Sequence, residues 1–201
     1  MQRITAVDPL ARRRAPLVAV LTVALVALIA ALAPAAQASI YQWTFDFPSA
    51  VAPSTNYSFS LYNEHIGDDV VYHDRGPYCT GINLGWGDGT TRQWRFRRTT
   101  GATGPLRYGE RLALRNTKYM DYLHYGSRPC GINLEWTDDA DYEWVIKGGP
   151  TGTAVTVESD NALYNVTEPD YLVYAWRAGD VINLRWWKDA EEWYCQYHSY
   201  C

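Results

Sequence analysis

"GINLGW", residues 81–86, returns as "GINLEW" at 131–136 and as "VINLRW" at 181–186, at intervals of fifty residues. Repetition at a fixed interval of this length indicates a chain built from copies of one supersecondary unit. Within each copy Ile, Leu and Trp alternate with other residues, so the three side chains fall on one face of an extended chain. We therefore predict a β-strand at each position, with that face toward the core.

The similarity between the copies extends on both sides of these six residues. Upstream segments end at Asn63, Asn116 and Asn165, a second set ends at Tyr72, Tyr125 and Tyr174, and Trp94, Trp144 and Trp193 follow downstream. Aromatic, alternating segments joined by Gly, Asp and Pro favour strands over helices. The pattern predicts an all-β protein of three four-stranded repeats, at about 57–98, 110–148 and 155–201, in which the repeated tryptophans are packing residues.

Three four-stranded units of this length resemble the β-trefoil superfamily over residues 57–201. The resemblance implies a barrel closed by three hairpins. A solenoid of the same period is the alternative, but it would leave two unpaired sheet edges, which a closed barrel removes.

The four cysteines are Cys79, Cys130, Cys195 and Cys201, and their even number predicts two disulfides in an oxidising compartment. A zinc site is the competing interpretation, although no Cys-x-x-Cys pair is present. The trefoil resemblance places Cys79 and Cys130 at equivalent positions of the hairpin cap. It implies the pairs Cys79–Cys130 and Cys195–Cys201, with exchanged pairing left open.

Residues 1–38 are predicted to be a signal peptide, because arginines precede an uncharged run from Ala15 to Ala33 and "AQA" ends at Ala38. An N-terminal membrane anchor is the alternative. Removing the segment takes four of the 18 basic and one of the 22 acidic residues, which leaves 14 and 21 and a formal charge of −7. This charge argues against nucleic acid or an anionic membrane as partner and favours a basic one.

The segment 39–56 reads as an extra N-terminal arm with a Pro-containing linker. Tyr41, Trp43, Phe45 and Phe47 share one face of an extended chain. A free arm of this kind suits strand addition to an extracellular protein, so these four residues are predicted to bind the partner. The alternative is that the arm folds back onto its own barrel.

No nucleophile beside a base, and no ligand cluster, is recognisable in the sequence, so we predict no enzyme, no cofactor and no metal. The turns that follow the "INL" strands offer carboxylates for sugar hydroxyls: Asp88, Asp138, Asp139 and Asp189. The Gln-x-Trp signature of the ricin-B-like trefoil lectins is missing, since Gln93, Glu143 and Glu192 directly precede a tryptophan. Asn83, Asn133 and Asn183 are interpreted as residues that fix their strands by hydrogen bonds.

These observations favour a secreted, non-catalytic adaptor that docks an extracellular protein. Its layout is similar to that of adaptor subunits in actinobacterial umbrella toxin particles, which makes a toxin complex one setting for it. A carbohydrate-binding lectin is the alternative, and a protease inhibitor is the third hypothesis.

Overall fold

The computed structural model describes residues 40–49, 51–74, 82–88, 92–128, 131–157, 161–175 and 182–187. Within these residues the protein contains twelve strands and no helix, so no helix there could cross a membrane. The strands are β1 (Trp43–Asp46), β2 (Ser60–Asn63), β3 (Asp68–Tyr72), β4 (Leu84–Gly87), β5 (Trp94–Arg98), β6 (Arg111–Asn116), β7 (Tyr122–Tyr125), β8 (Leu134–Thr137), β9 (Trp144–Lys147), β10 (Ala162–Asn165), β11 (Asp170–Tyr174) and β12 (Leu184–Trp186). The prediction of an all-β protein is confirmed.

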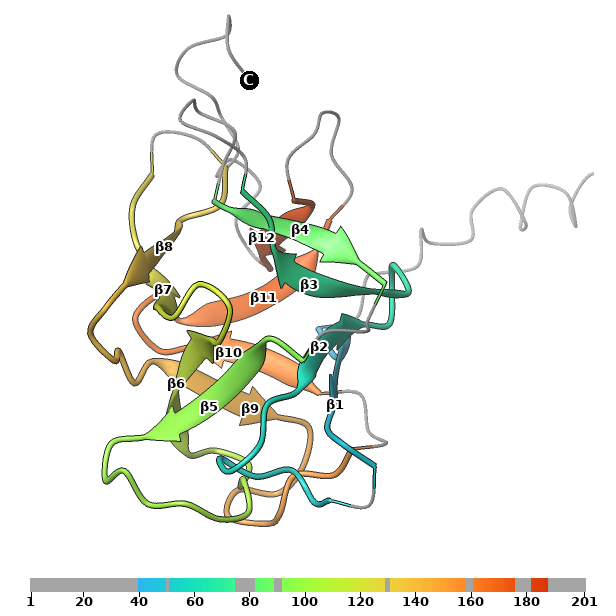
Figure 1. The fold of residues 1–201 in the computed structure, drawn as a ribbon, viewed down its shortest axis with the longest axis vertical. Coiled ribbons are helices and arrows are strands. Elements are labelled where there is room, and N and C mark those ends of the chain that lie inside the picture. Colours follow the sequence, from blue (N-terminus) through green and yellow to red (C-terminus); the bar gives the residue numbers. More distant parts are fainter. Residues whose placement is uncertain are drawn as a thin grey trace, which may run out of the picture. The chain divides into compact units, whose positions relative to one another are not determined.

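All the strand pairs are antiparallel, and six strands follow one another in a ring of contacts. β1 pairs with β2, β5 with β6, β6 with β9, and β9 with β10. Isolated bridges complete the ring, from Phe59 to Trp94 and from Trp43 to Asn161. The other six strands form the pairs β3–β4, β7–β8 and β11–β12, which lie in the upper half of Figure 1.

Three tryptophans hold the ring to these hairpins in the same way. Trp43, Trp94 and Trp144 begin β1, β5 and β9, and each is fully buried. Their indole Nε1 groups donate to the carbonyl oxygens of Leu172 at 2.8 Å, Val70 at 2.6 Å and Leu123 at 2.7 Å. A buried indole N–H needs such an acceptor, so the hydrogen bond fixes the position and orientation of each indole ring in the core.

The residue before each tryptophan makes a second equivalent contact. The side-chain oxygens of Gln42 and Gln93 accept the backbone N–H groups of Tyr174 at 2.8 Å and Tyr72 at 3.0 Å. Glu143 accepts the N–H of Tyr125 in the same position. These buried side chains therefore serve the attachment of the hairpins to the ring.

The turn after β2, β6 and β10 is also repeated. Asn63, Asn116 and Asn165 are fully buried, and each side-chain oxygen accepts the N–H groups two and three residues later. In this role the Asn side-chain oxygen serves as the acceptor for two backbone N–H groups of the turn. Four residues after the first two asparagines, Gly67 and Met120 have positive φ angles of 76° and 78°. The second is unfavourable for a residue with a Cβ.

The interpretation of residues 39–47 as an extra arm is corrected by β1, which is one of the twelve strands. Trp43 and Phe45 are 0% exposed and Phe47 is 4% exposed, whereas Tyr41 is 43% exposed. Phe45 packs edge-on against Phe59 and Phe96, with both pairs of ring centroids 5.4 Å apart. The alternative, a stripe that folds back onto its own protein, describes the structure, because three large aromatic side chains gain free energy by burial.

The strands consequently fall into the units β1–β4, β5–β8 and β9–β12, one strand earlier than the sequence analysis placed them. The residues predicted to face the core are buried at Ile82, Leu84, Ile132, Leu134, Ile182, Leu184 and Trp186, whereas Trp86 and Trp136 are partly buried against the core. Trp193, the four cysteines and residues 1–38 lie outside the described residues. The disulfide and signal-peptide predictions therefore stay predictions.

Candidate functional site

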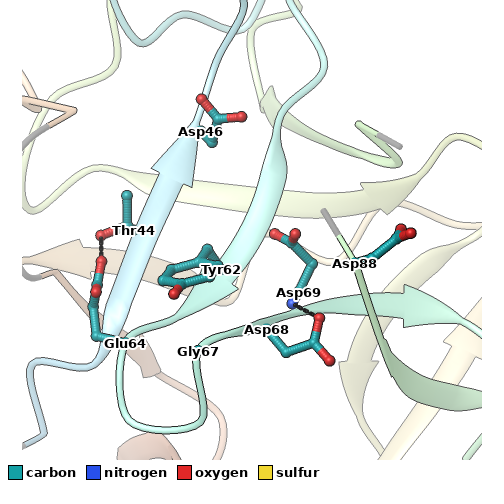
Figure 2. Close-up of a pocket in the computed structure, with 8 residues that line it drawn as sticks. All are labelled: Thr44, Asp46, Tyr62, Glu64, Gly67, Asp68, Asp69 and Asp88. Carbon is teal, nitrogen blue, oxygen red and sulfur yellow. Dashed lines mark hydrogen bonds between the residues drawn. The ribbon is translucent and has the colours of Figure 1, made fainter. Parts of the chain in front are cut away.

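Five carboxylates surround a cavity of about 400 Å³ in the first unit (Figure 2). Its lining comes from β1, β2, the turn after β2, β3 and the residue after β4: Thr44, Asp46, Tyr62, Glu64, Gly67, Asp68, Asp69 and Asp88. We call this cavity the acidic pocket. Its size is that of a site for a small molecule or for one or two side chains of a partner.

Asp69 is the most enclosed of the five acids. It lies in the middle strand of three, opposite Tyr62 of β2 and Gly87 of β4, and is 3% exposed. Its backbone N–H is taken by Asp68 Oδ1 at 2.9 Å, and its own Oδ1 is buried without a hydrogen-bond partner. A buried carboxylate oxygen without a donor is costly, so this side chain is the strongest sign of a binding site in the pocket.

The electrostatics of the pocket follow from this crowding. Burial, as the larger cause, and repulsion from Asp68, Asp46 and Asp88 together raise the pKa of the Asp69 carboxyl from 3.8 to about 6. Both effects disfavour the charged form, and both would be relieved by a cation or a hydrogen-bond donor placed in the pocket. The pocket therefore lacks positive charge at its centre.

Two side-chain contacts lie at the rim of the acidic pocket. Arg92 Nη2 lies 3.2 Å from Asp46 Oδ2, with both side chains about half exposed (41% and 54%). Thr44 Oγ1 donates to Glu64 at 2.5 Å, and Figure 2 shows this pair on the far side of Tyr62 from Asp69. Exposed ion pairs such as Arg92–Asp46 contribute little and can be exchanged for a ligand.

The other two units carry different chemistry at the same places in their strands. Counting from the equivalent tryptophans and asparagines, the positions of Thr44, Asp46 and Tyr62 are taken by Arg95, Arg97 and Arg115 in the second unit and by Val145, Lys147 and Tyr164 in the third. The position of Asp69 is taken by Tyr122 and Tyr171. The acidic pocket is thus a feature of the first unit alone among the described residues.

The residues predicted to bind sugar are separated by the structure. Asp88 lines the acidic pocket, whereas Asp138 and Asp139 are exposed in the loop after β8, and Asp189 lies outside the described residues. Asn133 supports the strand-fixing interpretation, because its Oδ1 accepts the N–H of Arg128 at 2.9 Å. Sequence reasoning missed Asp46, Glu64, Asp68 and Asp69, whose only signal was the local run of two aspartates.

A second cavity of about 340 Å³ lies between the second and third units, lined by Arg111, His124, Tyr125, Asp141, Tyr142, Glu143, Val166 and Thr167. His124 Nδ1 is 3.2 Å from Asp141 Oδ2, a pairing that the sequence analysis did not predict. Glu143 is occupied by the N–H of Tyr125 and by Asn165 Nδ2. The cavity has fewer free acceptors than the acidic pocket, which leaves the latter as the better candidate.

Within the part of the chain that the structure describes, no group of three or more His, Cys, Asp or Glu side chains is arranged to hold a metal ion. Comparisons with known protein families, with characterised proteins and with solved structures find no match to this chain.

Proposed function

We propose that the protein is a secreted, non-catalytic adaptor of the β-trefoil fold, and that its acidic pocket takes basic side chains of an extracellular protein. Six strands form one ring, and three strand pairs are attached to it. Each third of the chain contributes two ring strands and one of these pairs, and this arrangement supports the trefoil assignment. The proposal of secretion rests on the leader-like residues 1–38. We propose the acidic pocket as the docking site in place of the N-terminal stripe, because three of the stripe's four aromatic side chains belong to the core.

The observation that carries the proposal is the buried, unpartnered Oδ1 of Asp69 among four further carboxylates. A guanidinium or ammonium group supplies several N–H donors and a positive charge together, which answers both the missing hydrogen bond and the raised pKa of Asp69. Lysine and arginine side chains are also long enough to reach into a pocket from the surface of a partner.

The test is affinity capture from native culture medium, followed by mass spectrometry, with three forms of the protein. Asp69→Asn/Asp88→Asn removes two charges from the acidic pocket, and Asp138→Asn/Asp139→Asn removes two from an exposed loop as a matched control. We expect basic proteins to be retained by the wild type and the control and lost by the pocket variant. Equal retention by all three forms would sink the proposal.

A lectin is the second candidate, because the ring of Tyr62 lies in the same pocket as carboxylates that could accept sugar hydroxyls (Figure 2). A glycan array distinguishes the two. Hits that the pocket variant loses, together with empty capture lanes, would favour the lectin.

A further inference from the structure

Five cationic side chains project from the outer face of three adjacent strands, on a chain whose predicted exported part has a formal charge of −7. We call them the basic stripe: Arg95 and Arg97 of β5, Arg111 and Arg115 of β6, and Lys147 of β9. Their neighbours in these strands, such as Phe96, Leu112 and Ile146, are fully buried in the core. Alternation along the strands therefore places all five cations on the side away from the core.

The strand register brings these cations together. Arg95 is directly opposite Arg115 in the β5–β6 pair, and Arg111 is opposite Val145 in the β6–β9 pair. Neighbouring strands are about 4.8 Å apart, and residues two apart on one strand are separated by about 6.6 Å. Like charges directly opposite each other destabilise a sheet, so the fold carries a cost here that packing does not explain.

No acidic side chain in the described part of the chain forms an ion pair with the basic stripe, although Arg95 Nη2 and Arg115 Nε each donate to a backbone carbonyl at 3.0 Å, those of Asn56 and Met120. Arg98 and Arg92, which flank it in sequence, form ion pairs with Glu110 and Asp46, but no ion pair there involves a stripe residue. The Nε atoms of Arg95 and Arg97 are buried and lack an acceptor. Asp141 and Glu143, which share a cavity with Arg111, are engaged by His124 and by Tyr125 and Asn165.

We infer that the basic stripe is a binding site for an anionic polysaccharide, whose carboxylate or sulfate groups pair with the guanidinium groups. Guanidinium ions match such planar or trigonal anions with two parallel hydrogen bonds. The apolar residues between the cations, Ala113 and Val145, are 0% and 4% exposed. A protein partner would find no apolar centre to bury, whereas a hydrophilic chain with regularly spaced charges needs none.

The aromatic rings at the two sides of the stripe are already covered by its cations. Arg115 lies 5.5 Å from the ring centroid of Tyr122, and Lys147 lies 5.6 Å from that of Tyr164. These contacts hold the cations in place and cover one face of each ring, which reduces the area on which a nucleic-acid base could stack. An extended polyanion without bases is therefore the better fit.

The experiment measures binding of the purified protein to dextran sulfate, alginate and neutral dextran at 50 and 300 mM NaCl. We expect both anionic chains to bind at low salt, neutral dextran not to bind, and the affinity to fall at least about tenfold at high salt because screening weakens exposed charge pairs. The variant Arg97→Gln/Arg111→Gln should bind at least about tenfold more weakly. The charge-matched control Arg107→Gln/Lys118→Gln should stay within about twofold.

Neither Arg97 nor Arg111 makes an ion pair among the described residues, and far-ultraviolet circular dichroism checks the fold of the double variant. If the double variant is misfolded, the single variant Arg95→Gln is tested in its place, with the same expected loss of binding. Absence of binding at 50 mM NaCl, equal binding by the stripe variant and the control, or tighter binding of polyglutamate or duplex DNA would each overturn the inference. The acidic-pocket variants should bind the polysaccharides normally, so this inference can fail while the proposed function stands.

Discussion

Replacing Trp43 by Phe tests whether the N-terminal strand is an integral part of the barrel. The indole of Trp43 is fully buried and donates to the carbonyl of Leu172, 129 positions away in the chain. The phenyl ring keeps most of the apolar surface but cannot donate, and it leaves part of the indole's volume empty. Losing the buried hydrogen bond and opening the cavity should together cost about 2–4 kcal/mol, below the about 3–5 kcal/mol of a full truncation to Ala.

The assay is guanidinium unfolding of the purified variants, followed by far-ultraviolet circular dichroism so that the changed tryptophan does not bias the signal. Trp94→Phe and Trp144→Phe should lose similar amounts, because their indoles make the same contact in the other two units. The control Tyr57→Phe alters a ring that is 41% exposed and should change the free energy of unfolding by less than about 0.5 kcal/mol.

A free energy of unfolding for Trp43→Phe within about 0.5 kcal/mol of wild type, alongside full losses for Trp94→Phe and Trp144→Phe, would refute this reasoning. It would mean that β1 contributes nothing to the cooperative unit. The N-terminal stripe would then again be available as a docking arm.

Two further predictions concern single positions outside the tryptophan set. Asp69 has its folded-state pKa raised to about 6 from 3.8, so its contribution to stability is fully present below pH 4 and is lost as the pH rises through 6. Asp69→Asn should therefore stabilise the protein at pH 7, by about 1 kcal/mol after allowance for solvent screening. It should also reduce the change in the free energy of unfolding between pH 4 and 6. A variant less stable than wild type at pH 7 would contradict this. Met120→Gly should raise the free energy of unfolding by about 0.5–1 kcal/mol, because a residue with a Cβ is strained at a φ of 78° where the first unit has Gly67; an unchanged or lower melting temperature in calorimetry would count against it.

The strand content and the core face of each repeat were predictable from the sequence, but the starting point of the repeat was not. A pattern that recurs around a closed ring can be cut at any strand. Gln42–Trp43, Gln93–Trp94, Glu143–Trp144 and Glu192–Trp193 offer four candidate beginnings for three units. We placed the last three at the ends of the predicted repeats, which left the first pair over as an arm. The hydrogen bond from Trp43 to the carbonyl of Leu172, in the third unit, identifies the first pair as part of the ring.

The acidic pocket could not be predicted because no sequence spacing brings its residues together. Asp46 and Asp88 are separated by about forty positions, and they meet through the pairing of β1 with β2, β2 with β3 and β3 with β4. Asp88 alone of the five acids was predicted as a site residue, as a turn carboxylate that could bind sugar. The sequence does not reveal that the equivalent turn of the second unit, at Asp138, faces no such cluster.

The comparison between units also separates what the fold requires from what it merely permits. The tryptophans, the capping asparagines and the Gln or Glu before each tryptophan recur because they attach the hairpins to the ring. At the position of Asp69 the other units have Tyr122 and Tyr171, each directly before the residue whose carbonyl accepts an indole N–H. A tyrosine thus satisfies the same backbone geometry without burying an unpartnered carboxylate. The fold therefore does not need an acid at this position, which is why we propose that Asp69 serves ligand binding.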